Sequence, residues 1–455
     1  MNYAEFALIR FGSGLSPRHQ GPESADALLD SLRVDGGRRN FPALDTDTAS
    51  GVLRAFEIAN RDEQKTPDGP AIREQAADRL NQIVNDAIRA RFARAVDDPT
   101  GFADRLVQFW ASHFSIRAGG PHLRILGAAF QEDAIRARLT GRFADMLGAA
   151  TMHPAMLMYL DQAGSIGPRS NFARNNADRR EFGLNENHAR ELLELHTMGV
   201  GGSYDQTDVR QLAKLMTGLG LDSERRFVYR PNRAEPGAET VLGRAYGGGR
   251  PPKLAEVTAF FDDIAVHPDT AAHIARKLAV HFCADDPPAD LIGDLAARFR
   301  ETGGDLMAVY DVLVRHPAAV LSFGQKVRQP LDYITASLRA LGLSGAEIIA
   351  WQANELHAGA LAPMQRMGQP VLGAPQPEGW PEAADAWLGP QLLAARIDFA
   401  MRQPKRLRDP LPDPRDFVQV ALGTRAAAVA GAVARAESLS DGVGLVLASP
   451  QFNRR

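Results

Sequence analysis

The feature that most constrains the fold is a three- and four-residue spacing of apolar side chains that recurs along most of the chain. Residues 69–96, 132–147 and 206–220 show it over several turns, and this spacing places apolar side chains on one face of an α-helix. Ala and Arg, both strong helix formers, dominate the polar faces. Further helices are expected over 253–265, 269–282, 289–303, 305–316, 326–342, 386–401 and 413–447. The sequence therefore predicts an all-α fold, a multi-helix globular bundle.

Two stretches interrupt the helical pattern. Residues 226–250 combine β-branched and aromatic residues with Pro, Asn and Gly, which predicts a short β-hairpin or extended excursion. Residues 362–390 hold six prolines together with Trp380 and Trp387. Prolines at this density oppose a regular helix, and the tryptophans indicate a loop packed onto the body. We expect three regions packed as one compact unit: an N-terminal helical region over 1–225, the insertion over 226–252 and a C-terminal helical region over 253–455.

Charge and cysteine content exclude some classes of protein. The chain carries 52 Lys and Arg against 55 Asp and Glu, a net charge of −3, which argues against a nucleic-acid binder. Its single cysteine, Cys283, rules out an intramolecular disulfide framework and a cysteine-based zinc site within one chain. Glu5 and Arg10 interrupt the only apolar stretch near the start, so no secretory signal is expected. No apolar run is long enough for a transmembrane helix, and the expected location is the cytoplasm.

The most unusual run is NENHARELLELH, residues 185–196. Asn185 or Asn187 can cap the helix that begins here, and a cluster of glycines from 199 to 202 ends it. On a helical wheel that advances about 100° per residue, Asn187, Glu191 and Glu194 share one face. His196 falls within the apolar stripe and is expected to be a core histidine.

The shared face of Asn187, Glu191 and Glu194 has two interpretations. Their oxygens suit a hard divalent cation such as Ca²⁺, Mg²⁺ or Mn²⁺, or the two carboxylates form a pair for acid/base catalysis. Arg190 would then clamp an anion or a carboxylate. His113, in the run FWASHF, is either a structural histidine or a proton shuttle or metal ligand facing Glu191. The alternative is a solvated helix face on which Arg190 forms ion pairs with its glutamate neighbours.

A polar loop leads into this segment. Asp161 begins it, and Gly, Ser, Asn and Arg residues follow as far as residue 176. Such a loop can line a pocket over the N-terminus of the next helix, where an anion would be stabilised. It can equally be a hydrogen-bonded connector.

The run NENHARELLELHTMGV, followed by YDQTDVRQLAKLMTG, resembles the signature of the bacterial DUF1800 family, which is largely uncharacterised. The similarity includes residues 7–17, 106–116, 153–168, 239–249, 274–288, 326–342, 367–381 and 447–455. It spans essentially the whole chain but implies no established activity. Relatives often carry a secretory or twin-arginine leader, and position 188, here His188, is commonly aromatic or aliphatic. The resemblance also implies a protein partner of the DUF1501 type, a family similar to sulfatases and alkaline phosphatases.

Two hypotheses follow. The first is an enzyme or metal-binding protein centred on residues 183–197, with metal-assisted hydrolysis as the natural reaction. The second is a non-catalytic helical binding or scaffold protein, in which the Trp-bearing loop docks a partner. A concave pocket that joins Glu191 and Glu194 to His113 or Asp161 would favour the first. Ion pairs that saturate both carboxylates would favour the second; the candidates for such pairs are Arg190, Arg179 and Arg180.

Overall fold

Helices make up most of the molecule, as the spacing of apolar residues predicts. The computed structural model describes residues 1–34, 40–41, 43–178 and 183–455. Within these ranges the strands form two small antiparallel pairs, and the other regular elements are helices. The prediction of a mostly helical globular fold with a short β-hairpin excursion is therefore confirmed.

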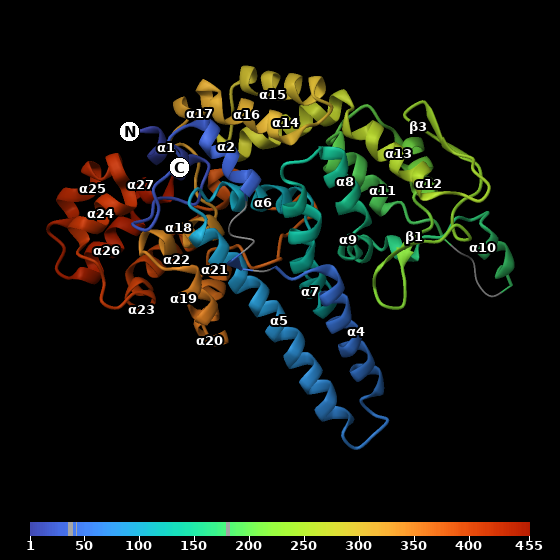
Figure 1. Ribbon diagram of the computed structural model, residues 1–455, viewed down its shortest axis with the longest axis horizontal. Helices are drawn as coiled ribbons and strands as arrows, with labels where there is room; N and C mark the ends of the chain where they lie inside the picture. Colours follow the sequence, from blue (N-terminus) through green and yellow to red (C-terminus); the bar gives the residue numbers. More distant parts are fainter. Residues whose placement is uncertain (35–39, 42, 179–182) are drawn as a thin grey trace.

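The first half of the chain contains a pair of long helices, α4 and α5, that contact each other and project from the body (Figure 1). The bounds in this half are α1 Tyr3–Arg10, α2 Ala25–Val34, α4 Thr46–Asp62, α5 Gly69–Asp97, α6 Phe102–His113, α7 Pro121–Phe130, α8 Phe143–Met152, α9 Pro154–Tyr159, α10 Asn171–Asn175, α11 Asn187–Glu191 and α12 Gln206–Leu215. Two π-helices, η1 Gln131–Ile135 and η4 Leu192–Thr197, continue α7 and α11, and short 3-10 helices are η2 Arg136–Arg138 and η3 Gln162–Gly164.

The strands follow α12. β1 (Leu219–Leu221) pairs with β2 (Phe227–Tyr229), and β3 (Ala238–Val241) pairs with β4 (Arg244–Gly247). The helix predicted over 206–220 is wrong at its end, because the helix stops at Leu215 and the chain turns into β1. Gly218 makes that turn at φ +92°, a left-handed conformation that glycine adopts without steric cost.

The second half returns to helices. Their bounds are α13 Leu254–Ala265, α14 Pro268–Phe282, α15 Ala289–Glu301, α16 Leu306–Arg315, α17 Pro317–Leu321, α18 Pro330–Ala340, α19 Gly345–Ala350, α20 Ala353–Leu356, α21 Ala362–Arg366, α22 Pro390–Arg402, α23 Pro404–Leu407, α24 Pro414–Leu422, α25 Ala427–Val433, α26 Leu439–Ala448 and α27 Pro450–Asn453, with the π-helix η5 His357–Leu361 and the 3-10 helices η6 Ala384–Ala386 and η7 Gly423–Arg425. Among the helices of the described ranges, none combines the length and the hydropathy that a membrane span requires.

The irregular part of the proline-rich segment begins after residue 366. Residues 362–366 form α21, which contains Pro363 and continues the π-helix η5 (His357–Leu361) without a break. The expectation that the whole of 362–390 lacks helix is therefore wrong at its start. From Met367 onward the chain is mostly irregular, and Trp387 is only 2% exposed, so this loop is packed onto the body as expected.

Two hydrophobic clusters hold the fold together. The first collects buried side chains between Phe6 and Ala319, and the second joins Phe92, Ala93 and Val96 of α5 to residues 331–452. Every residue of α18 is buried, so this helix lies at the centre of the second cluster. Apart from the α5 residues, the first cluster is formed by residues before about 320 and the second by residues after it. The division into the three regions expected from the sequence stays a prediction.

A buried charge cluster links the two halves. Asp332 of α18 accepts Arg328 Nη1 at 2.8 Å and lies 3.2 Å from Arg105 Nη1 and 3.4 Å from Arg455 Nε. All four side chains are at most 2% exposed. Burial alone would raise the pKa of Asp332, but the three guanidinium groups hold it below its ordinary value. A buried carboxylate is stable only when charges of this kind compensate it.

Candidate functional site

A cleft of about 550 Å³ opens between four segments that lie far apart in the sequence. This volume suits a small organic molecule. Most of its wall is apolar, and its lining residues are Phe109, Ser112 and His113 of α6, Glu194 and Leu195 of η4, Val200, four residues of α14 (His273, Arg276, Lys277 and Val280), and Pro375 with Glu378–Glu382 of the proline-rich loop. The cleft therefore contains Glu194 and His113, two of the residues expected from the sequence, whereas Asn187, Arg190 and Glu191 are not among its lining residues.

The segment that carries Glu194 is not a regular α-helix. The α-helical turn ends at Glu191, and η4 continues with wider π turns, in which Met198 N donates to Leu193 O at 2.9 Å. Each residue after Leu192 therefore departs from the angular position that a regular wheel assigns. At the start of the segment, Asn187 N donates to Asn185 Oδ1 at 2.9 Å, so Asn185 supplies the capping oxygen.

The structure places the other expected site residues as follows. Asn187 is exposed, and Glu191 is partly buried. Glu191 lies close enough to Glu194 for that charge to act on it: burial first, and then the Glu194 carboxylate, raises the pKa of Glu191. Arg190 Nη2 contacts Glu186 Oε2 at 3.3 Å. Within the described parts of the chain, neither Glu191 nor Glu194 forms an ion pair, so Arg190 does not saturate this carboxylate pair.

The described residues do not provide a cluster of metal ligands. In the described residues, no group of three or more His, Cys, Asp or Glu side chains is arranged to hold a metal ion. Asn187, the third oxygen donor expected beside Glu191 and Glu194, is exposed. Arg179 and Arg180, two of the expected partners of the carboxylates, lie outside the described residues. The cation site therefore stays a prediction.

Two histidines fix the π-helix from opposite helices. His113 Nε2 of α6 donates to His196 O at 3.1 Å, and His273 Nε2 of α14 donates to Leu195 O at 3.2 Å. Burial holds the pKa of His113 well below its ordinary value and lowers that of His273 to about 4, so both imidazoles are neutral. His196 is 1% exposed, in the core position expected for it. His113 thus orients the segment that carries Glu194.

Lys277 and Glu378 are site residues that the sequence reasoning missed. Lys277 of α14 is partly buried, and burial lowers the pKa of its amine to about 8, an effect that Glu382 and Glu378 partly oppose. A signal for Lys277 was available, since His273 and Lys277 are four residues apart in a predicted helix and must share a face. The sequence held no comparable signal for Glu378, because only the course of the proline-rich loop brings this residue to the cleft.

The proline-rich loop is held against the helices at the edge of the cleft. His281 Nδ1 donates to Glu382 Oε1 at 2.6 Å, and Lys326 Nζ lies 3.3 Å from Glu382 Oε2. Trp380 N donates to Ser112 Oγ at 2.9 Å. Burial alone would raise the pKa of Glu382, but His281 and Lys326 hold it below its ordinary value. Glu382 is therefore an anchor, and its charge is already compensated.

The polar loop over 161–176 does not line this cleft. Arg169 Nε pairs with Glu235 Oε1 at 2.5 Å, and Ser165 Oγ accepts Asn185 N at 3.1 Å. These bonds tie the loop to the strand region and to the start of α11. Its described residues behave as the hydrogen-bonded connector that was one of the two expectations.

The fold and the cleft define a mostly helical protein whose ligand-sized cleft is closed on one side by a proline-rich loop. The family model described as "protein of unknown function (DUF1800)" matches residues 7–454, and the chain belongs to this family. The resemblance seen in the sequence is thereby confirmed. No curated protein and no solved structure matches the chain. Its function is therefore inferred from the cleft itself.

Proposed function

We propose that the chain is an enzyme that binds a small, largely apolar organic molecule in the cleft and hydrolyses it with Glu194 as the acid/base group that meets the substrate. Glu191, which is coupled to Glu194 but does not line the cleft, is proposed as the second carboxyl group of the pair. One observation carries this proposal. The Glu194 carboxylate forms no ion pair with any described residue and lies in a ligand-sized cleft that also contains the amine of Lys277. A charged group in such a position is available to a substrate.

The electrostatics of the carboxylate pair support acid/base chemistry. Burial and the charge of Glu194 raise the pKa of Glu191, and two neighbouring carboxyl groups whose charges oppose each other are an arrangement that acid/base hydrolysis uses. Lys277, with a pKa of about 8, is partly neutral in mildly basic solution and can accept a proton there. No step in this scheme uses a metal ion.

The proline-rich loop offers little support for the alternative of a scaffold protein that docks a partner through its tryptophans. Trp387 is buried, and Trp380 lines the cleft, so both tryptophans contact the chain itself. A partner of the DUF1501 type stays an expectation from the family resemblance.

The experiment is a hydrolysis screen with chromogenic carboxylic esters, anilides and phosphoesters that carry short apolar groups. Wild type is compared with Glu194→Gln and Lys277→Met, and Glu74→Gln on the exposed face of α5 is the matched control. We expect turnover of one ester class, a loss in kcat of about 10²-fold or more in Glu194→Gln, in line with general acid/base catalysis, and an unchanged control. Absence of turnover across the panel, or full activity in Glu194→Gln, would overturn the proposal.

A further inference from the structure

A second cavity lies on the other side of the cleft wall. Trp380 and Ser112 line both spaces, so the two cavities adjoin at these residues. The second cavity offers about 50 Å³, and since one water needs about 10–15 Å³ of such space, it accommodates a ligand of only a few heavy atoms. Its walls include Phe130 from the first hydrophobic cluster and Leu331 from the second.

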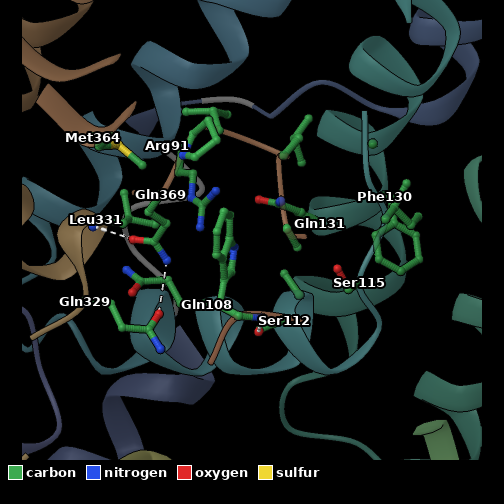
Figure 2. A pocket seen from close by; sticks show the side chains of 18 residues that line it. Arg91, Gln108, Ser112, Ser115, Phe130, Gln131, Gln329, Leu331, Met364 and Gln369 are labelled. Carbon is green, nitrogen blue, oxygen red and sulfur yellow. Dashed lines mark hydrogen bonds between the residues drawn. The ribbon is translucent and has the colours of Figure 1, made fainter. Parts of the chain in front are cut away.

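Arg91 of α5 brings a positive charge into this cavity. Its guanidinium group points into the space between Gln131 and Gln369 (Figure 2). Within the described parts of the chain, Arg91 makes no hydrogen bond and no ion pair. Burial lowers its pKa to about 10, an effect that the charges of Asp104 and Glu132 partly oppose, so it is charged at neutral pH. A partly buried cation of this kind is unfavourable unless an anion compensates it.

The carboxylates nearest to Arg91 are engaged elsewhere. Glu132 pairs with Arg94, and its second oxygen lies 3.1 Å from Arg136 Nε. Arg136 also pairs with Asp104. These contacts direct both carboxylates toward Arg94 and Arg136, so neither supplies an ion pair to Arg91.

Three other polar side chains of the cavity, Gln108, Ser112 and Ser115, can donate to a ligand. Ser112 Oγ accepts Trp380 N, which leaves its own O–H free to donate. Gln108 Oε1 accepts Arg105 Nη1 at 3.1 Å, which leaves the amide N–H groups of Gln108 available. The Ser115 hydroxyl lines the same space and makes no side-chain hydrogen bond with a described residue. One cation and several neutral donors together indicate an anionic ligand.

Gln329 and Gln369 already have hydrogen-bond partners and form part of the cavity wall. Gln369 Oε1 accepts Leu331 N at 2.7 Å, and Gln369 Nε2 donates to Gln329 Oε1 at 3.1 Å (Figure 2). This chain of bonds holds the far side of the cavity in place. The donors that remain for a ligand therefore lie on α5, on α6 and at Ser115, just after α6.

We propose that this cavity binds a small monocarboxylate. A planar guanidinium pairs with a carboxylate through two parallel hydrogen bonds, and the single charge of Arg91 matches a monoanion. Phosphate and sulfate carry more charge than one arginine compensates. Phe130, Leu331 and Leu372, which also line the cavity, provide an apolar surface for a short hydrocarbon group. The site is distinct from the Glu194 cleft and does not depend on the proposed hydrolysis.

The test is a thermal-unfolding titration of the full chain with acetate and propionate at constant ionic strength. Acetamide serves as the neutral analogue, and inorganic phosphate and sulfate as the competing anions. We expect saturable stabilisation by the two carboxylates only. Arg91→Met should lose at least tenfold in apparent affinity, while Arg79→Met, an exposed arginine on the same helix, should behave as wild type.

Three results would overturn the carboxylate site: no saturable response to either carboxylate, an equal response to phosphate or sulfate, or an undiminished response in Arg91→Met. If Arg91→Met does not fold, Ser115→Ala takes its place, with a threefold or greater loss expected and an unchanged affinity counting against the site. The Glu194→Gln variant should retain the full carboxylate response, which separates this site from the acid/base pair of the cleft.

Discussion

Replacing His188 with leucine tests the inference that this histidine occupies an apolar position. Its side chain is fully buried, and neither ring nitrogen has a hydrogen-bond partner among the described residues. A buried polar group without a partner costs about 1–3 kcal/mol. Leucine is close to histidine in volume and carries no such cost. We therefore expect His188→Leu to be at least as stable as wild type at pH 7.5, and up to about 3 kcal/mol more stable.

The same variant has a specific pH dependence. Burial lowers the pKa of His188 to about 3, whereas an unfolded histidine titrates near about 6.5. As the pH falls below that value, the unfolded chain binds a proton that the folded chain does not, so stability is present above about pH 6.5 and is lost toward pH 3. With 1.36 kcal/mol per pKa unit, the loss from this one group between pH 7.5 and pH 5.5 is about 1.4 kcal/mol.

The assay is urea unfolding followed by far-UV circular dichroism at pH 7.5 and pH 5.5, at one ionic strength. The free energy of unfolding of His188→Leu should fall by about 1.4 kcal/mol less than that of wild type between the two conditions. The exposed His357 provides the control His357→Leu, which should follow wild type. An equal loss in wild type and His188→Leu, or a variant more than about 2 kcal/mol less stable at pH 7.5, would refute the reasoning, because the imidazole would then make hydrogen bonds that stabilise it.

Three further predictions concern the charge cluster, the loop and the carboxylate pair. Asp332→Asn should lose about 3–5 kcal/mol of unfolding free energy in urea titrations, because three buried guanidinium groups lose their carboxylate; a loss below 1 kcal/mol would contradict this. Gly379→Ala should displace the loop, since φ is +99° and a Cβ atom would lie 2.1 Å from a carbonyl oxygen of α6, and the Trp380 fluorescence should shift to longer wavelength; an unchanged spectrum would show that the loop adapts. Elemental analysis of untagged protein tests the predicted cation site: a stoichiometric metal in wild type that is lost in Glu191→Ala/Glu194→Ala would establish it, and far less than one metal ion per chain in both proteins would contradict it.

Helix positions were predictable because amphipathic spacing is a local property of the sequence. The residues at which the helices end were harder to predict. Gly218 stops the segment after α12 through a left-handed turn, and glycine spacing alone does not distinguish such a turn from a helical glycine. Pro363 lies within a helix, where the wider turns of the π-helix η5 pass into α21, whereas composition alone predicts that a proline ends a helix. Both errors arise where a single backbone conformation overrides composition.

The candidate site was only partly predictable. Glu194 and His113 do meet in one cleft, but a wheel with a regular advance could not place residues after Leu192, because a π turn leaves no clear signature in hydrophobic periodicity. Lys277 and Glu378 reach the cleft through tertiary packing from 83 and 184 residues beyond Glu194. No spacing rule connects positions so distant, and their contribution required the structure.

The course of the proline-rich loop explains why both cavities exist. At its start Gln369 bonds to Leu331 and Gln329. At its end Glu382 accepts a hydrogen bond from the neutral His281 and forms an ion pair with Lys326. The segment between these anchors passes over α6 and supplies the Trp380 wall that the two cavities share. Buried ion pairs seldom stabilise a protein more than well-packed apolar residues would. Here one ion pair and the hydrogen bonds of Gln369 and Glu382 fix the position of an irregular segment that has few internal hydrogen bonds, which apolar packing alone would specify less precisely. Weakening the Glu382 anchor should therefore disturb both cavities at once.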